Sequence, residues 1–228
     1  MEKYQTLFFD VDDTLLNFAA AERDALRLLF ANYQLPFTSE HETHYKTINQ
    51  KLWQSYENGH MSREQVLNTR FSLLLETYGQ QEDGRMMETK YRHFLEKGHE
   101  LMEGAFELIS NLHHHHDLYI VTNGVSTTQY KRLRSAKLDH FFKDIFVSED
   151  TGYQKPMKAF FDYVFARIPH FSDKKGLIIG DSLTADIKGG QQAGLDTCWF
   201  NPSRKHNETT IHPTYEIHHL EELYPILK

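Results

Sequence analysis

Five short runs of apolar residues constrain the fold of this chain more than any other feature of its sequence. They are rich in branched and aromatic residues, which is typical of buried strands. The runs lie at Thr6 to Phe9, Leu118 to Val121, Asp144 to Val147, Leu177 to Ile179 and Thr197 to Phe200. Segments with helical spacing separate the last four runs, as expected of a parallel sheet covered by helices. The sequence therefore predicts an α/β fold.

The segment between the first and second runs has a different period. Apolar residues recur there at helical spacing in four groups, which are Leu26, Leu29, Phe30 and Tyr33; Tyr45, Ile48, Leu52 and Tyr56; Val66, Leu67, Phe71, Leu74 and Leu75; and Met87, Tyr91, Phe94 and Leu95. Ser62 and Gln65 form a capping box ahead of the third group. We therefore expect residues 17–98 to be an all-helical insertion and residues 1–16 with 99–228 to form the sheet domain.

Charge and composition narrow the classes of partner and compartment. Hydrophobic residues make up 39% of the chain, a fraction that is typical of folded proteins and not of disordered ones. The net charge of -7 gives no general attraction for a nucleic acid polymer. No apolar run approaches the ~20 residues of a membrane helix, and the N-terminus lacks the features of a signal peptide. Cys198 is the only cysteine, so no intrachain disulfide can form. We expect a cytoplasmic monomer or homodimer that binds neither membrane nor nucleic acid polymer.

Polar residues follow three of the predicted strands directly. Asp10 ends the first, Thr122 follows the second and Asp181 comes just after the fourth. In open parallel sheets the carboxyl ends of the strands line the ligand crevice, so these side chains, far apart in sequence, are expected to meet at one edge. That edge is the candidate active site.

The acidic residues near these strand ends indicate a metal. Asp10 and Asp12 are two residues apart in FFDVDDTLL, and Asp181 and Asp186 lie in GDSLTADIKGG. Asp12 and Asp13 can also be read as the start of a turn or a helix cap, which is common at strand ends. However, clustered carboxylates resist ionisation unless a cation neutralises them. Oxygen ligands favour Mg2+, and a magnesium ion beside an aspartate suits phosphoryl transfer, with Asp12 as the acid and base.

Two further segments carry groups that suit a phosphate. Thr122, Asn123 and Gly124 form a transition from strand to loop whose hydroxyl and backbone amides can hold phosphate oxygens. Lys155 precedes Pro156, which we expect at the first position of a helix, and a lysine there can supply a fixed positive charge. Each signal is weak alone, since an isolated lysine is more often a solvated surface residue.

Together these segments resemble the four ordered motifs of the haloacid dehalogenase superfamily. The matching segments are DVDDT at Asp10 to Thr14, Thr122 with Asn123, Lys155 before Pro156, and GDSLTAD at Gly180 to Asp186. The resemblance covers most of the chain. It implies a Rossmann-like parallel-sheet core with a helical cap inserted after the first strand.

The resemblance also implies a role for each motif residue. Asp10 is expected to be the nucleophile and a ligand of Mg2+, and Asp12 the general acid and base whose main-chain carbonyl also meets the metal. Asp181 would be the other protein ligand. The remaining residues would act on the phosphate or around it: Thr122 and Lys155 grip it, Asn123 assists, and Asp186 orients a metal-bound water or Lys155.

The residue at position 12 separates subclasses of the superfamily, because the haloacid dehalogenases lack this second aspartate. A phosphatase is therefore favoured, and the pattern is most similar to the bacterial pyrimidine 5'-nucleotidases, which act on nucleoside monophosphates. Cues include TNGV with Gln129 after it, and the GYQKP segment. A phosphatase for phosphoglycolate or a sugar phosphate, a phosphomutase and a non-enzymatic binding module remain as alternatives.

The helical insertion would read the leaving group. Aromatic side chains there can stack on a base, but four candidates have spacings that already suit helix packing, so none is assigned to the site: Phe18, Trp53, Tyr56 and Phe71. Hinges are expected near Leu15 to Phe18 and Gly98 to Gly104. The run His113 to His116 looks like a metal site, but consecutive loop residues cannot all aim at one ion, which favours a solvated linker.

Overall fold

A computed structural model describes residues 3–80 and 82–228. It contains a parallel sheet whose strands run in the order β3-β2-β1-β4-β5-β6. The strands are β1 (Thr6–Phe9), β2 (Asp117–Thr122), β3 (Asp144–Val147), β4 (Gly176–Gly180), β5 (Asp196–Phe200) and β6 (Tyr215–Ile217). Every pair of neighbouring strands is parallel, so the predicted α/β fold is confirmed.

The strand order reverses direction at β1. Chain order proceeds outward from β1 through β2 to β3 on one side, and from β4 through β5 to β6 on the other. Such a reversal opens a crevice at the carboxyl ends of the two central strands, where ligands bind in open α/β sheets. We therefore expect a ligand site at the carboxyl ends of β1 and β4.

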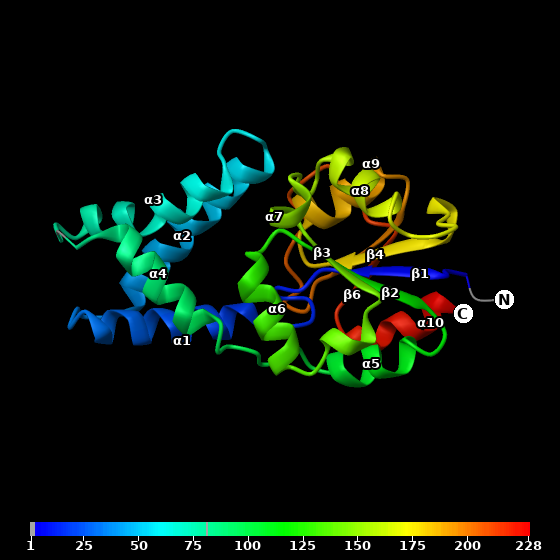
Figure 1. Cartoon of the computed structure of the whole chain (residues 1–228), viewed down its shortest axis with the longest axis horizontal. Helices are drawn as coiled ribbons and strands as arrows, with labels where there is room; N and C mark the ends of the chain where they lie inside the picture. Colours follow the sequence, from blue (N-terminus) through cyan, green and yellow to red (C-terminus); the bar gives the residue numbers. More distant parts are fainter. Residues whose placement is uncertain (1–2, 81) are drawn as a thin grey trace. The chain divides into compact units, whose positions relative to one another are not determined.

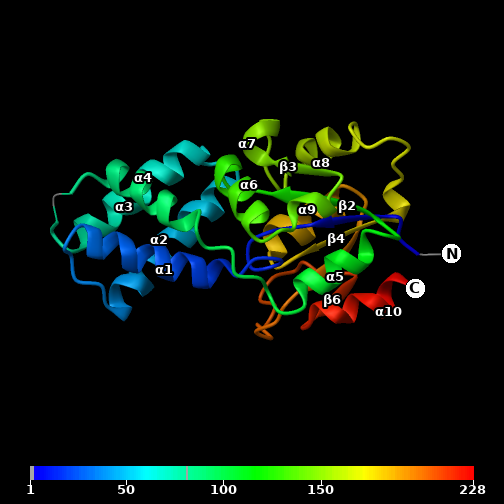
Figure 2. The same cartoon turned by 60° about the horizontal axis from the view of Figure 1, so that its bottom comes forward.

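Helices cover both faces of the sheet, as Figures 1 and 2 show. Leu7 and Phe9 of β1 belong to one core, together with residues of α5 (Ala105–Leu112), α6 (Ser126–Ser135) and α10 (Leu223–Leu227). Phe8 points the other way, into a core shared with α8 (Lys158–Phe165). This alternation follows from the two-residue period of a strand, and burial on both faces explains why β1 is wholly apolar apart from Thr6.

Three details differ from the sequence prediction. The strand β6 was not predicted, because its three residues, Tyr-Glu-Ile, are too short a signal. The helix α8 begins at Lys158 with Met157 as its N-cap, so the placement of Pro156 at the first helical position is wrong. In the histidine run, His114 and His115 are exposed, whereas His116 is buried with its Nδ1 2.9 Å from the carbonyl oxygen of Tyr4, so the solvated-linker prediction fails there.

The chain divides into two compact units, residues 1–18 with 99–228 and residues 19–98. The second unit contains most of α1 (Phe18–Asn32) and the helices α2 (Ser39–Glu57), α3 (Arg63–Thr77) and α4 (Gly84–Leu95). The predicted capping box of Ser62 and Gln65 is present at the start of α3. Among the aromatic candidates, Phe71 and Tyr56 are buried, and Trp53 packs edge-on against Tyr56.

A buried polar network connects the four helices of the second unit. Arg70 of α3 donates to both carboxylate oxygens of Glu88 on α4, at 2.7 and 2.8 Å. It also donates to Asn49 of α2 at 3.1 Å, and Asn49 donates to Glu22 of α1 at 3.2 Å. All four side chains are buried. Buried charges are tolerated only when they are paired, so these contacts specify how the helices pack.

The segments that lead into and out of the helical insertion pair with each other. The amide of Asn17 donates to the carbonyl of Glu100 at 2.8 Å, and the amide of Met102 donates to Leu15 at 2.9 Å. Leu16 and Leu101 form an antiparallel bridge between them. The regions where we expect hinges are therefore tied to one another. Among the described residues, no helix is long and apolar enough to cross a membrane.

Candidate active site

Three carboxylates meet at the carboxyl edge of the sheet. Asp10 follows β1, Asp181 follows β4, and Asp186 lies one helical turn beyond; one oxygen of each lies within 4.8 Å of the others. The main chain places Asp10 firmly, since its amide donates to Ile179 of β4 at 3.0 Å. The predicted convergence of the first and fourth strand ends is therefore what the chain topology produces at the reversal point.

Lys155 neutralises part of this cluster from within. Its ammonium group donates to Asp10 Oδ1 at 2.7 Å, to Asp186 Oδ1 at 2.6 Å and to the carbonyl of Val121 at 2.7 Å. The Lys155 side chain is 2% exposed. An ammonium has three hydrogens, and all three are directed at these acceptors. Lys155 thus holds the carboxylates of Asp10 and Asp186 together. To donate a hydrogen bond to a phosphate oxygen, it would have to give up one of these three hydrogen bonds.

The cluster perturbs the acidity of its members. Burial raises the pKa of Asp10 to about 7, with the charges of Asp186 and Asp12 adding to the effect and Lys155 opposing it. Burial likewise raises the pKa of Asp181 well above its usual range, helped by Asp10 and Asp186. Lys155 alone does not balance the buried carboxylates of Asp10 and Asp186 together with the half-buried carboxylate of Asp181, so the site has a residual demand for positive charge.

The second aspartate of the first motif lies apart from the three-carboxylate cluster. Arg132 pairs with Asp12 Oδ1, and Gln129 donates to Asp12 Oδ2 at 2.8 Å. Its side chain is 28% exposed, compared with 10% for Asp10. The expectation that all four aspartate carboxylates gather at one point is therefore corrected: Asp12 has its own partners, on α6.

Thr122, the last residue of β2, and Asn123, which follows it, make different kinds of contact. Thr122 Oγ1 accepts from the amide of Gly124 at 3.1 Å and from Gln129 Nε2 at 3.0 Å. Among the described residues no acceptor is assigned to its hydroxyl hydrogen, which is thus available to a ligand. The side chain of Asn123 instead makes two hydrogen bonds to the main chain of Lys155. Asn123 Oδ1 accepts from the amide of Lys155 and Asn123 Nδ2 donates to the carbonyl of Lys155, both at 2.9 Å.

Asp186 is held in place by its own loop. The amide of Ser182 donates to Asp186 Oδ2 at 3.0 Å, while Lys155 occupies Oδ1. Gly180 allows this approach, because a Cβ there would lie 2.2 Å from Asp186 Oδ2. Asp181 has no such partner: no hydrogen-bond donor among the described residues is directed at its carboxylate, although its carbonyl accepts from Trp199 at 2.8 Å. Asp181 is the carboxylate best placed to accept a cation.

A second lysine is anchored at the same edge in the same way as Lys155. Asn201, which follows β5, accepts from the amide of Lys205 and donates to its carbonyl, both at 2.9 Å. The positive charge of Lys205 lowers the pKa of Asp181 against the larger effects that raise it. Sequence reasoning did not find Lys205 or Arg132, since a lysine or arginine several residues beyond a strand gives no signal of its own.

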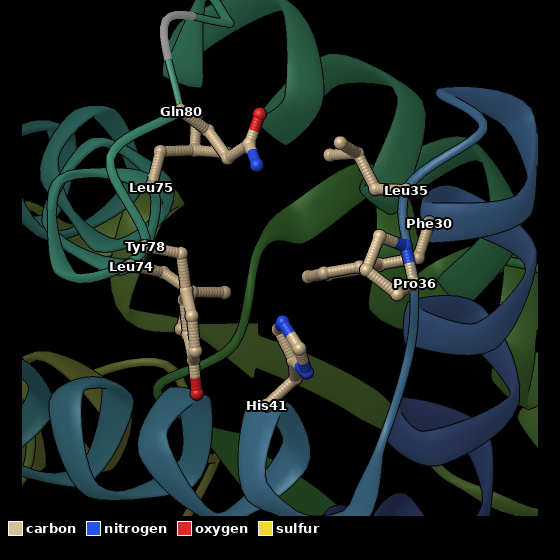
Figure 3. Close-up of a pocket in the computed structure, with 8 residues that line it drawn as sticks. All are labelled: Phe30, Leu35, Pro36, His41, Leu74, Leu75, Tyr78 and Gln80. Atoms are coloured by element: carbon tan, nitrogen blue, oxygen red, sulfur yellow. The ribbon is translucent and has the colours of Figure 1, made fainter.

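The helical unit contains a small concavity. Figure 3 shows Phe30, Leu35 and Pro36 facing Leu74, Leu75, Tyr78 and Gln80, with the ring of His41 between them. The rings of His41 and Tyr78 stack with centroids 4.1 Å apart. This lining is mostly apolar and has no carboxylate, so it offers nothing for metal or phosphate chemistry.

Comparison with known proteins gives a consistent picture. The family model described as haloacid dehalogenase-like hydrolase matches residues 7–200. The chain is 38% identical to the pyrimidine 5'-nucleotidase PynA of Streptococcus pneumoniae, covering 98% of this chain and 95% of PynA. It is 32% identical to the pyrimidine 5'-nucleotidase YjjG of Escherichia coli, with 99% and 98% covered.

A solved structure resembles the whole chain. It is the crystal structure of the HAD-hydrolase YfnB from Bacillus subtilis bound to magnesium, which reveals interdomain movement in that protein. The two chains are 65% identical, 99% of each is covered, and the TM-score is 0.95.

Proposed function

Because this chain belongs to the haloacid dehalogenase-like hydrolases, we propose that it is a magnesium-dependent 5'-nucleotidase that cleaves pyrimidine nucleoside monophosphates through a phospho-aspartyl intermediate on Asp10. The chain is a phosphoric monoester hydrolase. The observation that carries the proposal is the convergence of Asp10, Asp181 and Asp186 beside Lys155, with Asp12 held separately. The likeness to two pyrimidine 5'-nucleotidases over nearly the full chain supports the substrate class.

The donor set fits magnesium. Its three groups are carboxylates, and among the described residues no imidazole or thiol joins them. Magnesium prefers oxygen ligands and is usually held by one or two protein carboxylates. Asp10 and Asp181 are the candidates, since both have raised pKa values that a bound cation would offset. When bound, the ion would withdraw charge from the phosphate. The relative YfnB has been crystallised with magnesium, which supports this assignment.

In the first step, Asp10 attacks phosphorus. Lys155 occupies Oδ1, and no donor among the described residues is directed at Oδ2, which is thus free to form the new bond. As the O–P bond to Asp10 forms, the ester bond to the leaving oxygen breaks, and Asp12 gives that oxygen a proton. The hydroxyl of Thr122 donates to a phosphate oxygen. The products are the nucleoside and an acyl phosphate on Asp10.

In the second step, water hydrolyses the acyl phosphate. Asp12, now ionised, takes a proton from the water as its oxygen attacks phosphorus, and the bond between Asp10 and phosphorus breaks. Inorganic phosphate leaves, and both aspartates return to their starting states. We assign Asn123 to holding the Lys155 main chain, since both ends of its amide are engaged there. Asp186 keeps Lys155 in place from the other side.

We assign the helical insertion, residues 17–98, the role of a cap that excludes water from the intermediate and opens to release product. Interdomain movement in the relative YfnB supports such a role. Phe71 and Tyr56 are buried within the helical unit and are therefore excluded as base contacts, as their spacing predicted.

The test is phosphate release from six esters under one condition: UMP, dUMP, dTMP, AMP, phosphoglycolate and glucose 6-phosphate. We expect the three pyrimidine nucleotides to give the highest kcat/KM. Equal rates on all six would contradict the substrate assignment. Quenching during turnover should reveal a protein species heavier by one phosphoryl group, and its absence in both the wild type and slowed variants would contradict the covalent scheme.

A further inference from the structure

We propose that Gln129 and Arg132 are positioning residues that fix the Asp12 carboxylate for its proton transfers. The inference rests on the proposed function, which makes Asp12 the general acid and base. Both residues lie on α6, in the segment that follows the phosphate-binding Thr122. Neither lies in the cluster of Asp10, Asp181 and Asp186.

The contacts account for both oxygens of Asp12. Arg132 Nη1 pairs with Oδ1, and Gln129 Nε2 donates to Oδ2 at 2.8 Å. Two donors on successive turns of one helix hold a carboxylate against rotation about its terminal bond. A carboxylate has about four lone-pair sites, so one bond at each oxygen leaves a second site at each for a proton, a water or a leaving group. The 28% exposure of the Asp12 side chain means that these sites can be reached.

The amide of Gln129 has only one orientation that satisfies its neighbours. One hydrogen of Nε2 goes to Asp12 and the other goes to Thr122 Oγ1 at 3.0 Å, while Oε1 accepts from Arg132 at 3.1 Å. Gln129 therefore links the proton-transfer residue to the phosphate-binding residue. Gly124 leaves room for this side chain, because a Cβ at that position would lie 2.5 Å from Gln129 Nε2.

Arg132 is built into the sheet unit rather than lying on its surface. Its side chain is 1% exposed, and its guanidinium lies 5.6 Å from the ring centre of Phe18. A buried arginine that is paired with a partly exposed aspartate is poorly explained by stability alone, since burying such a charge is costly and a hydrophobic residue of similar volume often packs as well. A role in orienting Asp12 explains why the charge is kept there.

A positioning role predicts dependence on the leaving group. A nucleoside alkoxide is a poor leaving group and needs a proton from Asp12, whereas p-nitrophenolate departs without one. The parameter kcat/KM covers the steps up to departure of the leaving group, so it isolates the acid role from the later hydrolysis. A residue that only stabilises the fold would change kcat/KM for both substrates alike.

The experiment measures kcat/KM with UMP and with p-nitrophenyl phosphate for Gln129→Met, Arg132→Lys and Arg132→Gln, each checked by thermal unfolding. We expect a loss of about 10- to 100-fold with UMP and of under about 3-fold with p-nitrophenyl phosphate, because proton transfer by a positioned group contributes about 10²- to 10⁴-fold. Arg134→Gln is the matched control on the same helix. Arg134 is highly exposed and makes a surface ion pair with Asp139 at 3.7 Å. Its replacement should leave kcat/KM unchanged for both substrates.

Asp12→Asn separates failure of this inference from failure of the proposed function. If Asp12→Asn lowers kcat/KM equally for both substrates, Asp12 is not the acid and the proposed function fails. If Asp12→Asn is selective against UMP but Gln129→Met and Arg132→Lys are not, the positioning role fails while the function stands. The lysine variant keeps the buried charge, so it remains informative if Arg132→Gln does not fold.

Discussion

The ammonium group of Lys155 bridges Asp10 and Asp186, with hydrogen bonds of 2.7 and 2.6 Å to one oxygen of each. This contact joins the proposed nucleophile to a residue 176 positions further along the chain, at the centre of the sheet edge. Lys155 is itself fixed by Asn123 at its main chain. The bridge fixes the position of the Asp10 carboxylate within the folded protein.

Asp10→Asn should abolish turnover while the protein stays folded. The amide keeps the shape of the side chain and can still accept from Lys155, but it cannot attack phosphorus. We expect kcat to fall by at least about 10⁴-fold, the scale of losing a residue that acts within a catalytic unit. Circular dichroism and thermal unfolding check the fold. Substantial phosphate release by this variant would refute the covalent scheme.

Lys155→Met should cost both activity and stability. Removing the ammonium leaves Asp10 and Asp186 buried without their counter-ion, and breaking a buried pair in this way costs about 3–5 kcal/mol. Lys158→Met is the matched control, because Lys158 is exposed and pairs with Asp162 across one helical turn. Urea unfolding should show a large loss for the first variant and under about 1 kcal/mol for the second. Equal losses would contradict a structural role for the bridge.

Magnesium should raise the melting temperature of the wild type but not that of Asp181→Asn. A ligand that binds only the folded state stabilises it in proportion to the logarithm of its concentration over Kd. The carboxylate of Asp181 has no hydrogen-bond donor directed at it among the described residues, so its replacement removes a proposed metal ligand and breaks no side-chain hydrogen bond. Differential scanning fluorimetry across a magnesium series tests this. The same rise in both proteins would place the ion elsewhere.

Arg70→Met should destabilise the helical unit. Arg70 makes two hydrogen bonds to Glu88, and both side chains are buried. We expect a loss of up to about 3 kcal/mol, because the buried carboxylate would lose both hydrogen bonds from Arg70 and keep only Arg92 as its partner. Arg27→Met is the control, since Arg27 is 69% exposed and 3.6 Å from Asp24. In a Trp199→Phe background, Trp53 is the one tryptophan left and its fluorescence reports unfolding of this unit.

The contribution of Glu88 should be lost in acid. Burial opposes its ionisation, but Arg70 and Arg92 prevail and hold the pKa of Glu88 below its ordinary value of 4.5. A carboxyl with a lowered pKa stabilises the folded state above the unfolded-state pKa and loses this effect as pH falls through the folded-state value. The difference in unfolding free energy between wild type and Glu88→Gln should therefore be full above about pH 5 and shrink below about pH 4.5. A difference independent of pH would contradict the pairing.

The parts of the fold that follow from local pattern could be predicted from the sequence. Each of the strands β1 to β5 contains a short apolar run, and the capping box of Ser62 and Gln65 marks a helix start directly. The strand β6 has three residues and no such run, and the start of α8 is set by Met157 rather than by the nearby proline. Short elements are defined by their neighbours in the sheet, and the sequence alone does not contain that information.

Some residues of the candidate site could likewise be predicted from the sequence, and others could not. Asp10, Thr122 and Asp181 could be found because each ends an apolar strand, and chain topology brings such ends together. Arg132 could not be found, since its role depends on which turn of α6 faces Asp12. The task of Asn123 was likewise hidden, because a bidentate contact with the Lys155 main chain is a matter of geometry between distant segments.

The pairing of residues 15–17 with 100–102 has an evolutionary consequence. The insertion leaves the sheet unit and rejoins it at neighbouring points, so its length and sequence can change without stretching the chain or disturbing the strand order. Such an attachment lets one catalytic scaffold acquire different accessory modules, each imposing its own choice of ester on unchanged chemistry.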